Sequence, residues 1–535
     1  MRFTDDDRAK VADHLTAISS SFQTIGRIPA LAAGVVVDGE LIATCGNGAD
    51  EHTLFRIASM TKSFTAAAVL HLRDSLRLRL DDPVAFHVPE FASLRGPTND
   101  AATITIRHLL TMSSGMSTDD PWADRHLDMT DDELDSVIAE GPTFARTTGG
   151  ARQYSNLGYA VLGRAVLNVT GEPVQQLITD RFLEPLGMNE TFWNVTDAPA
   201  EIAVAIGMRT DGVKPEPAPG DGVMAPMGGL WSTVHDLAKW VSFFTDAYPA
   251  RNDVDDGLLS RASRREMQTV QTIELPHTVV AIDGASWPYF GGYGMGMFTD
   301  FDAELGHICG HSGGVPGYGS NMRWITGSEP GAALHSPTLA GSRIGVIALG
   351  NTTYAPMIHL TRRVLQSMRT HGLAGPVYKQ VPEALTTAAQ NLFRVLQRMA
   401  TSSAERPVAE GLSVAGPSPE GLSVAGPSPE GLSVAGLSVA GPSALGAPAL
   451  GVNGGGLFAD NVLLDEPLQE RVGKATSFVA ACEAGGSGSL RFVRCEAKTD
   501  ADATLVVAND QREFRIGFSL SVSPPNTIQA YKLPG

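Results

Sequence analysis

The sequence of 535 residues predicts an α+β domain of about 375 residues followed by a small all-β module. Two observations predict this architecture. Strand-patterned segments occur near both ends of the first region, whereas its middle is mainly helical, so one α+β domain whose sheet joins both ends is expected. Beyond residue 457 only short β-patterned runs occur. The length itself exceeds that of one ordinary domain.

The first elements are a helix, a hairpin and a second helix. Residues 5–25 have the spacing of an amphipathic helix. The apolar runs 31–37 and 41–45 surround Asp38-Gly39, which is a hairpin signature. Residues 59–76 then predict a helix whose middle is apolar almost all round, and such a helix is buried centrally.

The later elements return to strands. After a helix over 156–169, which Thr170-Gly171 closes, the pattern predicts strands and then a last helix. The expected strands are 307–315, 321–325 and 344–349, and the expected helix is 357–368. Early and late strands are therefore expected to share one sheet, so that the fold of residues 1–375 is complete only when the late strands have joined the early ones.

The C-terminal third divides into three predicted parts. A connecting helix is expected over 376–401, a linker rich in Gly, Ser, Pro and Ala over 402–456, and an all-β accessory domain over 457–535. Copies of Gly-Leu-Ser-Val-Ala-Gly start at 411, 421, 431 and 436. A decapeptide repeat with so little bulk buries too little surface to offset chain entropy, which predicts a flexible or partly extended linker. A short β-array is the alternative.

Composition excludes several classes of partner. The net charge of −18 and only eight scattered lysines argue against nucleic acid, whose phosphates need clustered cations. The N-terminus lacks a signal-peptide pattern and no apolar run approaches a membrane span, so a cytoplasmic protein is expected. The four cysteines show no zinc-ligand spacing. The sequence leaves the oligomeric state open, with a homo-oligomer among the alternatives.

Ser59 and Lys62 form the first candidate motif. Residues three apart on a helix share a face, so the amine lies beside the hydroxyl. Burial and the helix N-terminus disfavour the charged amine and lower its pKa from about 10.4. Lys62 could then take the proton of Ser59, because serine alone is a poor nucleophile. A capping serine followed by a solvent-facing lysine is the alternative.

Tyr154-Ser155-Asn156, the second motif, is the only Tyr-x-Asn in the chain and directly precedes a predicted helix. A phenol near a cationic lysine is shifted towards phenolate and can take a serine proton. The alternative is a packed tyrosine, with Asn156 as a helix cap.

The third motif, His311-Ser312-Gly313-Gly314, is the only His-x-Gly in the chain. Its glycines let a substrate approach a predicted strand, whose edge can supply an N–H to an oxyanion hole. The alternative is a glycine-rich turn with a solvated histidine.

Together the motifs resemble those of the serine β-lactamase and penicillin-binding protein family. The branch that they most resemble contains class C β-lactamases, D-alanyl-D-alanine carboxypeptidases, D-aminopeptidases and esterases, because the second motif is Tyr-x-Asn. Segments 104–115, 154–163 and 227–233 resemble that branch too, and the similarity covers about residues 25–370. It implies a β-lactamase/transpeptidase-like fold, in which an antiparallel sheet is flanked by helices and accompanied by a helical subdomain.

The resemblance also implies roles. Ser59 would be the acylated nucleophile, and Lys62 and Tyr154 would share the general-base work. The backbone N–H groups of Ser59 and Gly314 would form the oxyanion hole, and Asn156 would bind the substrate amide. The implied substrate-binding and oxyanion positions are Asn156, His311, Gly313 and Gly314. No metal or organic cofactor is implied.

One position departs from the pattern. True β-lactamases carry Lys at the position of His311, where it helps to bind a carboxylate, and a mostly neutral imidazole is a weaker anchor. Members with His there include D-stereospecific aminopeptidases and esterases. Trp122, Trp231, Tyr289 and Tyr293 are candidate pocket walls, with core packing as the alternative.

The resulting expectation is a serine hydrolase that cleaves a small amide or ester through an acyl-enzyme. A D-aminopeptidase or D-amino-acid amidase acting on a small molecule or short peptide is favoured. A carboxylesterase or an acyltransferase of the same family is the alternative within chemistry. A non-catalytic relative used for assembly or ligand sensing is the alternative from another class.

Overall fold

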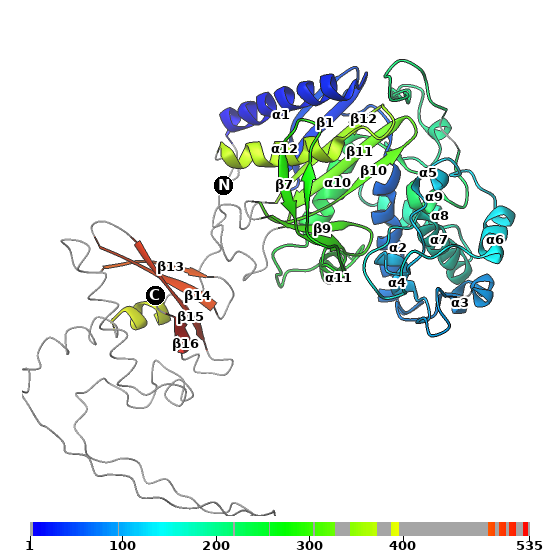
Figure 1. Cartoon of the computed structure of the whole chain (residues 1–535). Coiled ribbons are helices and arrows are strands. Elements are labelled where there is room, and N and C mark those ends of the chain that lie inside the picture. The colour runs from blue at the N-terminus through cyan, green and yellow to red at the C-terminus, as the bar shows by residue number, and fades with distance from the viewer. Residues whose placement is uncertain are drawn as a thin grey trace, which may run out of the picture. The chain divides into compact units, whose positions relative to one another are not determined.

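The structure, a computed structural model, contains two compact units, residues 1–379 and 380–535 (Figure 1). It describes residues 4–94, 96–217, 220–255, 257–302, 305–326, 343–371, 387–394, 491–497, 502–509, 513–520 and 528–532. The repeat linker predicted over 402–456 lies outside the described residues. The predicted boundaries at 375, 401 and 456 therefore stay predictions.

The first unit is built on an eight-stranded antiparallel sheet. Its strands, in spatial order, are β2 (Glu40–Asn47), β1 (Leu31–Val37), β12 (Ile344–Gly350), β11 (Tyr318–Ile325), β10 (Gly306–Val315), β9 (Phe298–Asp302), β8 (Gly291–Tyr293) and β5 (Thr272–Ile273). The first strand pairs with the last, in a register that sets Leu31 opposite Gly350. The sheet joins both ends of the unit, as predicted.

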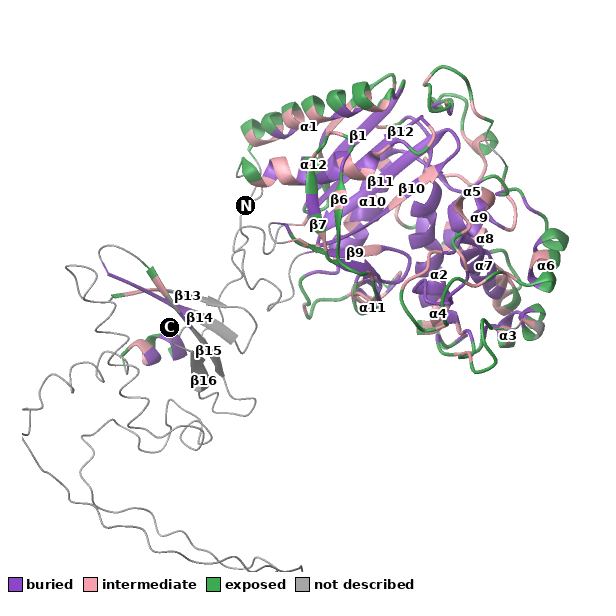
Figure 2. Ribbon diagram, in the orientation of Figure 1, coloured by how far each residue is buried: buried purple, intermediate pink, exposed green. Residues whose placement is uncertain are grey.

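Successive side chains of a strand point to opposite faces, so this sheet has two apolar faces, and helices cover each of them. On one face Val35 packs among apolar residues of α1 (Asp5–Gly26) and α12 (Met357–Thr370), including Leu15 and Val364. On the other face Val36 shares a core with Val241 of α10 (Val234–Thr245). Figure 2 shows the resulting buried layer between the two sets of helices. In the described part of the chain, no helix is long and apolar enough to cross a membrane.

A helical subdomain surrounds α2 (Thr61–Asp74), which is buried from Thr61 to Leu70. Phe64 of this helix stacks on Trp240 of α10, with ring centroids 3.8 Å apart. The other helices are α3 (Val84–His87), α4 (Ile106–Leu110), α5 (Asp120–Ala123), α6 (Asp131–Glu140), α7 (Asn156–Thr170), α8 (Val174–Ile178), α9 (Ala225–Gly228) and α11 (Arg261–Met267). Short 3-10 helices are η1 (Ala58–Met60), η2 (Pro89–Ser93) and η4 (Val195–Asp197), and η3 (Thr179–Leu183) is a short π-helix. Two small antiparallel pairs join β3 (Phe55–Arg56) to β4 (Trp231–Ser232) and β6 (His277–Val280) to β7 (Ser286–Tyr289).

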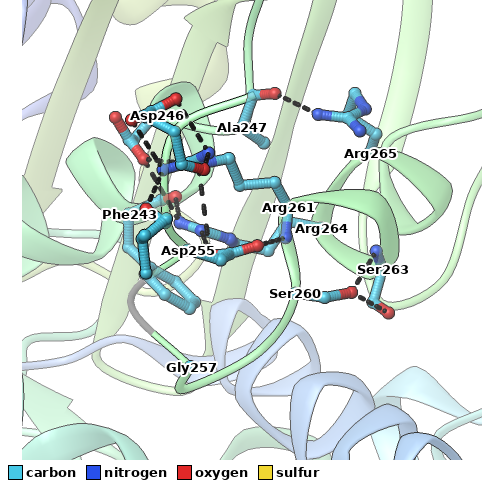
Figure 3. Close-up of polar contacts among 12 residues, drawn as sticks. Phe243, Asp246, Ala247, Asp255, Gly257, Ser260, Arg261, Ser263, Arg264 and Arg265 are labelled. Carbon is cyan, nitrogen blue, oxygen red and sulfur yellow. Dashed lines mark hydrogen bonds and ion pairs between the residues drawn. The ribbon is translucent and has the colours of Figure 1, made fainter. Parts of the chain in front are cut away.

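An arginine–aspartate cluster fixes α11 beside the end of α10 (Figure 3). Arg264 donates to Asp255 Oδ1 at 2.9 Å and to the carbonyl of Phe243, and its guanidinium lies 4.2 Å from the Phe243 ring centroid. Arg265 donates to the carbonyl of Ala247. These guanidinium groups meet carboxylates and carbonyls of the same chain, so the cluster stabilises the fold.

The second unit contains a four-stranded antiparallel sheet in chain order and a helical segment at 387–394. Its strands are β13 (Arg491–Ala497), β14 (Asp502–Ala508), β15 (Glu513–Leu520) and β16 (Ile528–Lys532). The predicted fold class is therefore confirmed: an antiparallel sheet with flanking helices and a helical subdomain, and a small C-terminal sheet.

Strand β10 lies very close to the segment that leads into α2. A Cβ atom added at Gly313 would stand 2.0 Å from the carbonyl oxygen of Ile57 and 2.3 Å from Ser320 Oγ. The same carbonyl accepts a 2.7 Å hydrogen bond from Ser320 Oγ. Only glycine at 313 therefore lets the sheet approach the start of the helix this closely.

We expect Gly313→Ala to lower the free energy of unfolding by about 1–3 kcal/mol, because the new methyl group must push backbone atoms apart. Urea unfolding followed by tryptophan fluorescence measures this. Gly220→Ala is the matched control, since its methyl group would meet only Asp128 Cβ, at 3.9 Å. Equal stability of the two variants would contradict the prediction.

Candidate active site

The three sequence motifs meet at one cleft of about 630 Å³. Ser59 comes from η1, Tyr154 from the residues before α7, and His311 from β10. The cleft is lined by Ser59, Thr118, Asp120, Asp124, Arg146, Ala151, Arg152, Gln153, Tyr154, Ile273, Glu274, Leu275, Phe298, His311, Ser312, Gly314 and Tyr354. It thus lies where the helical subdomain meets the sheet.

Lys62 lies directly behind Ser59 and is fully buried. In its ammonium form, Nζ donates to three oxygens: Ser59 Oγ at 2.9 Å, Asn156 Oδ1 at 2.6 Å and the carbonyl of Met227 at 2.7 Å. The predicted contact between the Ser59 hydroxyl and the Lys62 amine is present, one helical turn apart. The solvent-facing alternative for Lys62 is wrong.

Burial lowers the pKa of Lys62 to about 8, and the carboxylates of Asp120, Asp124 and Asp119 oppose this shift. Loss of hydration disfavours the ammonium form more than these negative charges favour it. A group with this pKa exchanges its proton near neutral pH, which is the range that a general base requires.

Tyr154 stands over the same lysine, with Nζ 4.9 Å from the ring centroid. The pKa of Tyr154 is raised well above its usual value, first by burial and then by the negative charge of Asp120, although a side-chain hydrogen bond with Ser59 lowers it. The expected shift towards phenolate is therefore wrong for the free protein. The sequence showed the neighbouring cation but not the depth of burial.

Asn156 is held between the lysine and two aspartates at the start of α7. Its backbone N–H donates to Asp119 Oδ1 at 2.8 Å, and its Nδ2 donates to Asp120 Oδ1 at 2.7 Å. The helix cap is Ser155, whose hydroxyl accepts from the N–H of Gly158. Asn156 therefore does not cap the helix, and its amide instead points towards Lys62.

His311 is a neutral imidazole of fixed orientation, with only 2% of its surface exposed. Its Nδ1 lies 2.6 Å from the carbonyl of Ser312, which can only accept, so Nδ1 carries the proton. Its Nε2 then accepts from the Tyr293 hydroxyl at 3.0 Å. Burial, aided by the charge of Lys62, lowers the pKa of His311 to about 3. The expectation of a neutral histidine here agrees with this environment.

Two backbone features lie beside Ser59 and Gly314, and the predicted oxyanion role of their N–H groups stays a prediction. Ala58 has a left-handed φ of 50°, a conformation that costs a non-glycine residue about 1–3 kcal/mol. Strand β9 pairs with β10 only as far as Gly310, so in the described chain no strand covers that edge at 311–315. Gly314 lines the cleft there, beneath the ring of Tyr354.

Two cleft residues that sequence reasoning missed are Asp124 and Tyr354. The Tyr354 hydroxyl donates to Asp124 Oδ2 at 2.7 Å, across 230 positions of sequence. Burial raises the pKa of Asp124 to about 7, and the hydrogen bond from Tyr354 lowers it. The run Asp119-Asp120 before Trp122 was the only signal of an acidic wall in the sequence.

The opposite wall pairs a cation with an anion. Arg152 donates to Glu274 Oε2 at 2.6 Å and lies over the ring of Phe298. The four aromatic residues suggested as pocket walls do not line this cleft, so that interpretation is wrong. Tyr293 instead holds His311 from behind, while the cleft's aromatic rings come from Tyr154, Phe298 and Tyr354.

Comparison with known proteins identifies the family of this chain. The family model described as "Beta-lactamase" matches residues 13–367. Protein flp of Staphylococcus aureus (strain MW2) is 29% identical over 391 residues, which cover 69% of this chain and 68% of that protein. Penicillin-binding protein 4 of Amycolatopsis lactamdurans is 29% identical over 325 residues, 59% of this chain and 82% of the relative.

Solved structures share the fold. An octameric penicillin-binding protein homologue from Pyrococcus abyssi superimposes with a TM-score of 0.54 at 19% identity, covering 95% of this chain and 96% of its own. A class C β-lactamase gives a TM-score of 0.52 at 16% identity, covering 69% of this chain and 99% of its own. The matched family model spans most of the chain, which therefore belongs to the β-lactamase family of serine hydrolases.

Proposed function

We propose that this protein is a serine hydrolase that forms an acyl-enzyme at Ser59, and that it prefers small amides or peptides whose acyl part carries a free ammonium group. D-Aminoacyl amides and peptides are the favoured class. The observation that carries the proposal is the acidic wall of Asp120 and Asp124 in the cleft of Ser59, combined with a neutral His311.

Support for Ser59 as nucleophile comes from the hydrogen bonds of Lys62. The neutral amine has two N–H bonds and one lone pair, while Asn156 Oδ1 and the Met227 carbonyl can only accept. Those two oxygens take the N–H bonds, so the lone pair is left facing Ser59 Oγ, the partner that can donate. The serine proton then has an acceptor at 2.9 Å.

The chemical steps follow from this arrangement. Ser59 Oγ attacks the carbonyl carbon as its proton moves to Lys62, and the N–H groups of Ser59 and Gly314 stabilise the oxyanion. Tyr154, which stays protonated in the free protein, donates to the leaving nitrogen and regains a proton from Lys62. A water molecule then attacks the ester carbonyl and gives its proton to Lys62, which passes a proton to Ser59 Oγ as the ester bond breaks and the acid product leaves.

Substrate preference follows from charge. An ammonium group can pair with Asp124 or Asp120, which Tyr354 and Asn156 already orient by hydrogen bonds. The neutral His311 supplies no positive charge for a substrate carboxylate of the penicillin type. The preference for D-aminoacyl substrates rests on the resemblance to family members with His in the third motif. The same chemical steps would also cleave an ester.

Ser59→Ala should lower kcat by at least about 10³-fold, because the attacking oxygen is lost. It should also remove labelling by a fluorophosphonate probe. The panel comprises D- and L-aminoacyl nitroanilides, short-chain nitrophenyl esters and a chromogenic cephalosporin. Ser312→Ala is the control, since the hydroxyl of this cleft serine accepts from Asn321 Nδ2 and contacts no lysine of the described chain, so the label at Ser59 should be kept.

Each outcome of that panel has a meaning. Faster turnover of D-aminoacyl nitroanilides supports an aminopeptidase or amidase, and faster turnover of esters favours the carboxylesterase alternative. Added amine or alcohol acceptors that divert the acyl group would favour the acyltransferase alternative. Labelling that persists in Ser59→Ala, or rapid cephalosporin turnover, would contradict the proposal.

Asp124→Asn should lower kcat/KM for substrates with a free amino group by about 10- to 100-fold, the worth of one charge-assisted hydrogen bond. Their N-acetylated analogues should change little, because they carry no ammonium group. Glu274→Gln is the matched control, as Arg152 already neutralises this carboxylate. A similar loss for acetylated and free substrates would show that Asp124 does not recognise the ammonium group.

The pH profile of a neutral ester tests the role of Lys62. Its burial-lowered pKa of about 8 means that the amine is protonated, and cannot accept a proton, at lower pH. We expect kcat/KM to rise up to about pH 8 and then to level off. Asp124→Asn should move this rise to lower pH, because Asp124 raises the pKa of Lys62. A profile that is flat across this range would argue against Lys62 as base.

A further inference from the structure

A second group of functional side chains lies outside the cleft, where three segments meet. His52 belongs to the turn before β3, Glu190 to the loop after η3, and His235 to the first turn of α10. One ligand atom from each lies within 4.8 Å of the others. His52 Nδ1 stands 2.8 Å from Glu190 Oε1, and His235 Nδ1 stands 3.5 Å from Glu190 Oε2.

The central carboxylate is held in place from both ends. Glu190 Oε2 accepts from Thr233 Oγ1 at 2.8 Å, and the Glu190 backbone N–H donates to Asp236 Oδ2 at 2.7 Å. The backbone N–H of His235 donates to the carbonyl of Glu51 at 3.0 Å, so the turn that carries His52 is tied to α10. Oriented ligands of this kind lose little conformational freedom on binding an ion.

His235 Nδ1 has an unsatisfied position. The atom is inaccessible to solvent and, among the described residues, has no hydrogen-bond partner of acceptable geometry, although the imidazole edge is partly exposed. The ring centroids of His52 and His235 lie 4.8 Å apart. A buried polar atom without a partner is costly, and an ion shared with Glu190 would satisfy it.

We infer that His52, Glu190 and His235 bind one zinc-like divalent cation. Two imidazole nitrogens and one carboxylate oxygen suit Zn²⁺, Co²⁺ or Ni²⁺ rather than Mg²⁺ or Ca²⁺, which prefer oxygen ligands. Water completes the coordination. None of the three residues lines the Ser59 cleft. The ion would therefore have a structural role, in which it links the three segments that carry its ligands. One of these segments, the turn of His52, continues through β3 to η1.

Zinc titration of the chelator-treated, full-length protein tests this inference. The wild type should bind one more equivalent of Zn²⁺ than His52→Gln or His235→Gln, and Zn²⁺ should raise its melting temperature but not theirs. Co²⁺ should give visible d–d absorption in the wild type alone. Mg²⁺ should produce neither effect.

Two controls keep the outcome decisive. His14 and His371 form another close pair of imidazoles, with ring centroids 4.0 Å apart, and His14→Gln should bind zinc as the wild type does. Hydrolase activity of His52→Gln should equal that of the wild type and so report an intact fold. Equal zinc stoichiometry in wild type, His52→Gln and His235→Gln, or an equal loss in His14→Gln, would overturn the site.

Discussion

The burial of the Lys62 amine is the constraint on which the remaining site depends. A buried amine is tolerated only when its hydrogen bonds are satisfied. Three parts of the fold provide the acceptors: η1 through Ser59, the start of α7 through Asn156, and α9 through Met227. The packing of these elements around α2 therefore has a polar centre, the Lys62 amine. If any one of the three elements were displaced, this amine would lose a hydrogen-bond partner.

Burial acts in opposite directions on the groups around this centre. It lowers the pKa of Lys62 and of His311, and it raises the pKa of Asp124 and of Tyr154. The common cause is that each charged form loses water, and each group moves towards neutrality. The protonation states of these four groups can therefore respond to an entering cationic group, whereas the paired charges of Arg152 and Glu274 line the same cleft.

The sequence predicted those features that depend on short segments. The hairpin at Asp38-Gly39, the end of α7 at Gly171 and the close contact of Ser59 with Lys62 each follow from local spacing. Features that depend on tertiary contacts could not be predicted in this way. Asp124 meets Tyr354 only because the subdomain folds against the sheet. The pKa of Tyr154 was misjudged because burial depth is invisible in a motif.

The fixed tautomer of His311 has a consequence for how such a site can change in evolution. Its two ring nitrogens are committed to the Ser312 carbonyl and the Tyr293 hydroxyl, and only 2% of the residue's surface is exposed. A lysine introduced there would place a second ammonium near Lys62, with a phenol and a carbonyl as its neighbours. A shift of this site towards anionic substrates by that exchange would therefore also replace the two hydrogen bonds that now hold the imidazole.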